Sequence, residues 1–184
     1  MTARNPIVDR ADGELEQVDS DRWRLTFRRP LRHSPEVVWR AITAKDELLA
    51  WFPHPIVGDW VVGGPLTFMS GIEGIDDFAG EVLAYDPPHL LSFSWAGDVI
   101  VLIVEADGDG SVLTLTDTFT ERGKATRDAT GWHSCLDKLA FALAGEKAPW
   151  DDVAQWKAMN PRYQAKLGPE ASTVGPPSEM PEHS

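Results

Sequence analysis

The chain has 184 residues, 42% of them hydrophobic, and carries a net charge of −12 with an isoelectric point near 4.7. This length and apolar content predict a globular domain with a sizeable core and argue against disorder of the whole chain. Because the chain is acidic and shows no cluster of Lys or Arg, we expect neither nucleic acid nor an anionic membrane as a partner.

Cys135 is the one cysteine, which excludes an intramolecular disulfide and a cysteine-based zinc site. Residues 1–14 lack the apolar stretch of a secretory signal, and no apolar run approaches the ~20 residues that span a bilayer. We therefore expect a cytoplasmic protein. We divide it into an N-terminal arm (1–20), a domain (21–146) and a proline-rich, partly disordered extension (147–184), with disorder beyond Gly168.

The first elements follow the arm, which we expect to be loose or to form an edge strand. Alternation of Trp23, Leu25 and Phe27 predicts a strand over 23–28. Ser34 and Pro35 are typical of a helix start, and a second short helix is expected from residue 45 to Trp51–Pro53. Further strands are predicted over 58–62, 66–69, 78–85, 90–95, 99–105 and 112–119, with a loop over 71–77.

The segment over 80–95 is the clearest β-hairpin signal. The turn at 86–89 contains two prolines, which cannot continue a strand ladder. After it, Leu91, Phe93 and Trp95 alternate with serines and therefore place three large apolar groups on one sheet face. A second hairpin turn is expected at 107–110, whose Asp-Gly pattern lacks the later ligands of a calcium loop.

Beyond residue 120 the apolar period becomes helical. Trp132, Leu136, Leu139 and Leu143 recur at i, i+4, i+7 and i+11, and Gly145 can end the helix. A short helix is possible over 153–159. The order of elements predicts an α+β fold, in which a curved antiparallel sheet of about six or seven strands grips one long helix and two short helices follow the first strand.

The motifs over residues 22–145 resemble those of the START-like (SRPBCC, helix-grip) superfamily. The closer resemblance is to the bacterial branch named after the C-terminal domain of the activator of the heat-shock-protein-90 ATPase. The matching segments are 35–43, 48–53, 62–64, 80–82, Pro88, Leu90, Trp95, 113–117, and 131–132 with Leu136 and Leu139. One departure is Asp117, where bacterial relatives often carry histidine. The resemblance implies a helix-grip fold, whereas members of this superfamily include carriers, enzymes and chaperone regulators.

A curved sheet gripped by a helix can leave an apolar cavity. We select as ligand-binding candidates the residues that we expect to face this cavity. The expected ligand-binding residues are Trp51, Phe68, Val82, Phe93, Trp95, Val101, Leu115, Asp117, Trp132, Leu136 and Leu139. Asp117, Glu81 and His54 are candidates to orient a ligand. Asp117 and His54 are also weak catalytic candidates, although alternation leaves open whether Asp117 faces the cavity or solvent.

The five histidines lack metal-ligand spacing, and we expect His89 and His133 on the surface. We predict no metal and no cofactor. The leading hypothesis is a monomeric or dimeric protein that binds a small hydrophobic molecule between sheet and helix, because we find no positioned acid–base pair. The alternatives are a chaperone-linked regulatory domain, which an exposed apolar patch would favour, and a cyclase- or hydrolase-type enzyme.

Overall fold

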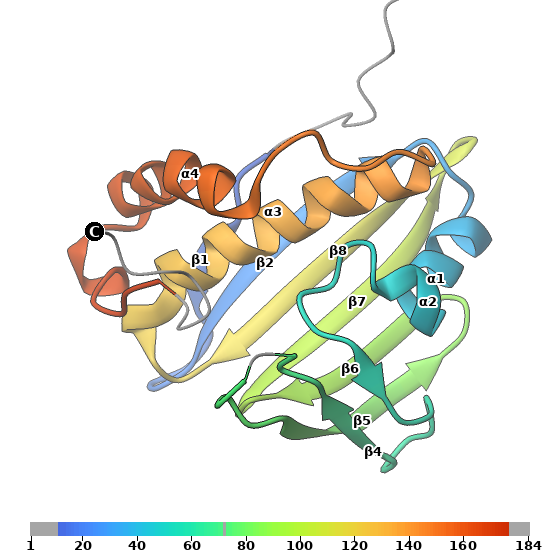
Figure 1. The fold of residues 1–184 in the computed structure, drawn as a ribbon, viewed down its shortest axis with the longest axis horizontal. Coiled ribbons are helices and arrows are strands. Elements are labelled where there is room, and N and C mark those ends of the chain that lie inside the picture. The colour runs from blue at the N-terminus through green and yellow to red at the C-terminus, as the bar shows by residue number, and fades with distance from the viewer. Residues whose placement is uncertain (1–10, 72, 177–184) are drawn as a thin grey trace, which may run out of the picture.

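A curved antiparallel sheet wraps around one long helix (Figure 1). The computed structural model describes residues 11–71 and 73–176, and within them the sheet has eight strands in the order β1-β2-β8-β7-β6-β5-β4-β3. The strands are β1 (Glu14–Gln17), β2 (Trp23–Leu31), β3 (Ile56–Val57), β4 (Pro65–Phe68), β5 (Phe78–Asp86), β6 (Leu90–Trp95), β7 (Asp98–Asp107) and β8 (Gly110–Phe119).

The helices lie at the ends and on one face of this sheet. They are α1 (Pro35–Thr43), α2 (Lys45–Leu48), α3 (Ala125–Leu143) and α4 (Asp152–Leu167), with short 3₁₀ turns η1 (Arg122–Lys124) and η2 (Pro169–Ala171). The α+β helix-grip prediction is confirmed. The strand count exceeds six or seven because the arm contributes the edge strand β1 and because β3 is a separate two-residue strand.

The predicted strand over 58–62 is wrong. Gly58 and Gly63 have φ angles of 122° and 78°, values that turn the chain out of an extended ladder. Between them, the Trp60 indole N–H donates to the carbonyl oxygen of Thr43 at 2.8 Å, which anchors the segment to the end of α1 as a loop. The loop predicted over 71–77 contains no strand in its described residues.

The core lies between the concave sheet face and α3. Leu113 and Leu115 on β8 and Leu136 and Leu139 on α3 are each at most 1% exposed. Alternation on β8 therefore matches burial residue by residue. No helix among the described residues is both long enough and apolar enough to cross a bilayer.

The C-terminal extension is more structured than its prolines indicate. Helix α4 runs over 152–167 rather than 153–159, and it includes Pro161. Pro161 lies on the solvent side of α4, where water can replace the backbone hydrogen bond that proline cannot donate. Figure 1 shows α4 beside α3 on the side away from the sheet, so α3 is covered on two faces.

The expectation of disorder beyond Gly168 is wrong for residues 169–176. Ala171 is fully buried, the Ser172 hydroxyl lies 2.8 Å from that of Thr126, and Val174 N–H donates to the carbonyl of Gly123 at 3.1 Å. These contacts hold the segment against the start of α3. Residues 1–10 of the arm and 177–184 of the extension lie outside the described residues, and the boundary at 146/147 stays a prediction.

Tyr163 joins the arm, α3 and α4 through one buried hydroxyl. Its oxygen accepts from Gly13 N–H at 2.9 Å and lies 2.8 Å from Nδ1 of His133. Both partners are buried, so removing the hydroxyl leaves polar groups unsatisfied. We expect Tyr163→Phe to lower the free energy of unfolding by about 1–3 kcal/mol in urea denaturation. The neighbouring exposed substitution Gln164→Ala should change it by less than about 0.5 kcal/mol, and equal effects would contradict this role.

Candidate functional site

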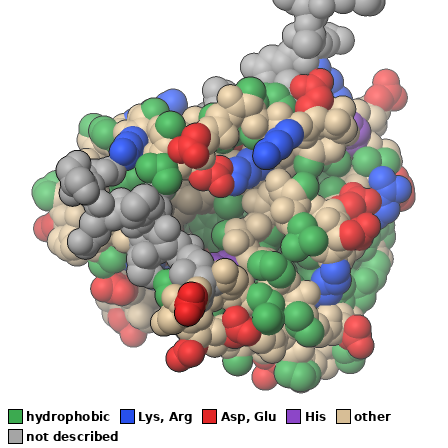
Figure 2. Space-filling view, viewed as in Figure 1, with side chains coloured by type: hydrophobic (Ala, Val, Ile, Leu, Met, Phe, Trp, Pro, Cys, Tyr) green, Lys and Arg blue, Asp and Glu red, His purple; other side chains and the backbone are tan. Residues whose placement is uncertain are grey.

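A pocket of about 430 Å³ opens between the N-terminal half of α3 and the strand ends nearest to it. In the space-filling view the surface is hollowed below α3, between the helix and the sheet (Figure 2). The lining residues are Pro53, His54, Phe78, Trp95, Ala96, Asp98, Asp117, Glu121, Lys124, Arg127, Asp128, Gly131, Trp132 and Cys135.

Aromatic rings form the apolar wall of the pocket. Phe78 and Trp95 meet edge to face with 5.0 Å between ring centroids, and Trp95 lies 5.9 Å from Trp132. Trp95 stands at the end of β6, just before the hairpin turn at 96–97, and Trp132 lies in the N-terminal half of α3. The wall forms where this strand end and the helix come together. Such rings offer flat apolar surface to a ligand.

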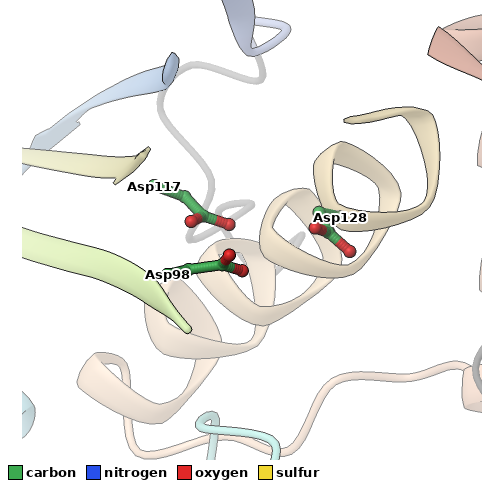
Figure 3. A group of neighbouring side chains, drawn as sticks. All are labelled: Asp98, Asp117 and Asp128. Carbon is green, nitrogen blue, oxygen red and sulfur yellow. The ribbon is translucent and has the colours of Figure 1, made fainter. Parts of the chain in front are cut away.

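A group of charged side chains adjoins this aromatic wall. Figure 3 shows Asp98 and Asp117 at strand ends, pointing toward Asp128 on α3, and carboxylate oxygens of the three lie within 4.8 Å of one another. The Lys124 ammonium donates to Asp98 and lies 3.4 Å from Asp128. Arg127 donates to Asp128 at 2.8 Å.

The three carboxylates are the described residues best placed to bind a metal ion. Burial disfavours the charge of Lys124, but Asp128 and Asp98 more than offset this and raise its pKa. The ammonium therefore already serves as the cation for two of the three acids.

Asp117 is the most perturbed acid of the pocket. It is 1% exposed because alternation along β8 turns it inward beside Leu115. Burial raises its pKa to about 8, with Asp98 and Asp128 adding to the shift. The Trp132 indole N–H donates to Oδ2 at 2.9 Å, and the buried Oδ1 has no hydrogen-bond partner. Asp117 is therefore a carboxylic acid at neutral pH.

His54 lies beside the aromatic wall of the pocket. It is 8% exposed, and its Nδ1 lies 3.0 Å from the carbonyl oxygen of Met69, which can only accept. Nδ1 therefore carries a proton. The ring packs edge to face on Phe78, with 5.3 Å between centroids, so His54 belongs to the pocket wall and not to an exposed loop.

Cys135 also lines the pocket, but it is not a nucleophile. Burial raises the pKa of its thiol to about 12, so the reactive thiolate is scarce at neutral pH.

The structure divides the predicted site residues into three groups. Trp95, Asp117, Trp132 and His54 line the pocket. Others are at most 2% exposed and fill the core instead: Trp51, Phe68, Val82, Phe93, Leu115, Leu136 and Leu139. The pocket is thus confined to one end of the helix, because these side chains close the remaining space between sheet and helix.

Two predicted residues lie away from the pocket. Val101 faces the outer side of β7, since its neighbours Ile100 and Leu102 are the buried ones. Glu81 is exposed on β5, next to the register shift between Val82 and Ala84. Neither can orient a ligand in this pocket.

The two histidines expected on the surface differ in outcome. His89 is exposed in its turn, as predicted. His133 is 2% exposed, so the prediction for it is wrong. It lies on the face of α3 that α4 covers, where it contacts Tyr163.

Sequence reasoning missed Asp98, Lys124, Arg127, Asp128 and Gly131. The i, i+4 spacing of Lys124 and Asp128 is a usable signal for an ion pair on a helix. The link from Lys124 to Asp98 joins two distant segments and has no counterpart in local sequence.

Solved structures share this fold at low sequence identity. A conserved protein of unknown function from Enterococcus faecalis has a TM-score of 0.70 and 20% identity, over 84% of this chain and 90% of that one. CalU16 from Micromonospora echinospora has a TM-score of 0.65 and 20% identity, over 85% and 99%. A protein from Bordetella parapertussis has a TM-score of 0.63 and 22% identity, over 91% and 96%.

No curated protein matches the chain. The family model described as "Activator of Hsp90 ATPase homolog 1-like protein" matches residues 32–144, a span that runs from the start of α1 to the end of α3. This agrees with the START-like resemblance of the motifs and with the helix-grip architecture. The chain therefore belongs to the Activator of Hsp90 ATPase homolog 1-like family.

Proposed function

We propose that this protein binds a small, largely apolar molecule in the pocket beside the N-terminal half of α3. The observation that carries the proposal is an aromatic wall of Phe78, Trp95 and Trp132 beside Asp117, a buried acid whose pKa is raised to about 8. Concave sites with apolar walls and few polar groups are typical of small-molecule binding. A cytoplasmic location and a monomeric or dimeric state remain predictions.

Gly131 offers a way to close the pocket without disturbing the fold. It lies in α3 on the pocket lining, and a Cβ added there meets no atom within 4 Å beyond its own helix and chain neighbours. A larger side chain can therefore extend into the pocket. Replacing a helical glycine also favours the helix by roughly 0.5–1 kcal/mol.

We expect native mass spectrometry of gently purified wild-type protein to show an extra mass that disappears on denaturation. Gly131→Ala should keep this mass, because it adds one methyl group to open space. Gly131→Phe should lose it while its melting temperature stays at or above that of the wild type. Equal retention of the mass by Gly131→Phe would contradict the proposed site, and a clean mass in all three would favour a protein partner instead.

A cyclase- or hydrolase-type enzyme is the second candidate function. The raised pKa of Asp117 favours it, because an acid that titrates near neutral pH is suited to proton transfer. This candidate predicts that Asp117→Asn keeps binding but loses turnover. If the wild type and Asp117→Asn both bind the molecule but neither turns it over, Asp117 is excluded as the catalytic acid.

A chaperone-linked role is the third candidate. Val57, Val61 and Val62 are 57–61% exposed around β3, and Leu83 on β5 is 41% exposed. Exposed apolar side chains of this size can mark a protein-binding surface. Stimulation of a chaperone ATPase by the wild type, reduced in a Val61→Ser, Val62→Ser variant, would support this role over the ligand-binding one.

A further inference from the structure

The two oxygens of Asp117 have different environments. Oδ2 accepts the indole N–H of Trp132 at 2.9 Å, and buried Oδ1 has no hydrogen-bond partner. A buried polar atom without a partner is costly, so its presence on a pocket wall points to a ligand group that completes it. Figure 3 shows the Asp117 carboxyl pointing from the end of β8 toward α3, and Asp117 is one of the residues that line the pocket.

The protonation of Asp117 decides what that group is. With a pKa of about 8, the carboxyl is neutral at pH 7, mainly because of burial and then because of Asp98 and Asp128. A neutral carboxyl accepts best at its carbonyl oxygen and donates from its hydroxyl. Since Oδ2 accepts from Trp132, the hydroxyl is best placed on Oδ1. The pocket therefore presents a hydrogen-bond donor at this point.

The neighbouring charges are already compensated. Lys124 is bonded to Asp98 and lies 3.4 Å from Asp128, and Arg127 donates to Asp128 at 2.8 Å. With Asp117 neutral, the carboxylates of Asp98 and Asp128 are paired with these two cations, and the exposed Glu121 is the remaining acid of the lining. A cationic or anionic ligand group would disturb this balance, whereas an uncharged oxygen would not.

On the basis of the proposed function, we propose that the ligand is a flat, apolar molecule with an uncharged carbonyl oxygen. This oxygen accepts a hydrogen bond from the Asp117 carboxylic acid. Trp95 and Trp132 contact the ring system of the ligand. Asp117 thereby acts as the specificity-determining residue of the pocket, distinguishing carbonyl compounds from hydrocarbons of equal shape.

Four naphthalene probes with similar outlines test this proposal: 2-acetylnaphthalene, 2-ethylnaphthalene, 2-naphthylmethylammonium and 2-naphthoate. Their dissociation constants are measured by calorimetry on the full chain at about pH 6 and about pH 9, on either side of the Asp117 titration. At the lower pH the ketone should bind about five- to tenfold more tightly than the hydrocarbon. At the higher pH this preference should disappear, because ionised Asp117 can no longer donate.

Asp117→Asn is the decisive variant, since its amide still donates and accepts but does not titrate. It should keep the ketone preference at both pH values. Gly131→Phe, which fills the pocket, should bind none of the probes.

The outcomes separate the two proposals. Equal binding of ketone and hydrocarbon, or tightest binding of the ammonium with an affinity that rises with pH, would overturn the role of Asp117 and leave the apolar pocket standing. Failure of all four probes to bind, or binding that Gly131→Phe retains, would contradict the pocket itself and this inference with it.

Discussion

Replacing Asp117 by asparagine should raise the free energy of unfolding by about 5 kcal/mol at pH 8 and by about 2 kcal/mol at pH 5. The pKa of Asp117 is about 8 in the folded protein, mainly because of burial, against 3.8 for an ordinary aspartate. Between these values the folded state holds a proton that the unfolded chain releases. Wild-type stability therefore falls as pH rises from 4 to 8, and asparagine removes this dependence.

The measurement is urea denaturation of both proteins at pH values from about 4 to 9. Asp109→Asn is the matched control, because Asp109 is exposed in the β7–β8 turn. Its effect should stay below about 0.5 kcal/mol at every pH. A difference between Asp117→Asn and the wild type that stays constant over this range would show that Asp117 does not titrate as its burial requires.

The sheet could be predicted because burial in it follows the two-residue period of a strand. Leu113, Leu115 and Asp117 alternate in the sequence and share the buried face of β8. The same rule fails where both alternating sets are apolar. On β7, the run Ile100, Val101, Leu102 carries no polar residue to mark the outer face, so the inward position assigned to Val101 had no support in the pattern.

The helices show a different limit of sequence reasoning. An amphipathic pattern reveals the face of α3 that packs on the sheet, but α4 covers a second face. His133 is buried there by Tyr163 of α4. Because proline disfavours a helix interior, Pro161 limits the sequence-based prediction to the short helix over 153–159. The charged group of the pocket was missed for a similar reason. Asp98 and Lys124 meet only because the start of β7 and the end of η1 lie close together in the folded chain.

Phe68 should be the core residue through which stability and ligand binding are linked. It is fully buried beneath the pocket, stacked on Phe78 at 5.0 Å and edge to face with Trp95 at 4.7 Å between ring centroids. Phe68→Ala should lower the free energy of unfolding by about 3–5 kcal/mol, because the ring is lost and the cavity only partly collapses. Urea denaturation measures this loss.

Phe68→Leu keeps most of the volume and should cost about 1–2 kcal/mol, which leaves the protein folded for binding measurements. Phe68 itself is not part of the pocket lining, whereas Phe78 and Trp95 are. If their positions depend on the ring beneath them, the leucine variant should weaken binding of an apolar probe such as 2-ethylnaphthalene. Val104→Ala is the control, since Val104 is equally buried but lies on β7 beyond the pocket lining. Equal affinities in both variants would mean that the aromatic wall holds its shape without support from the core.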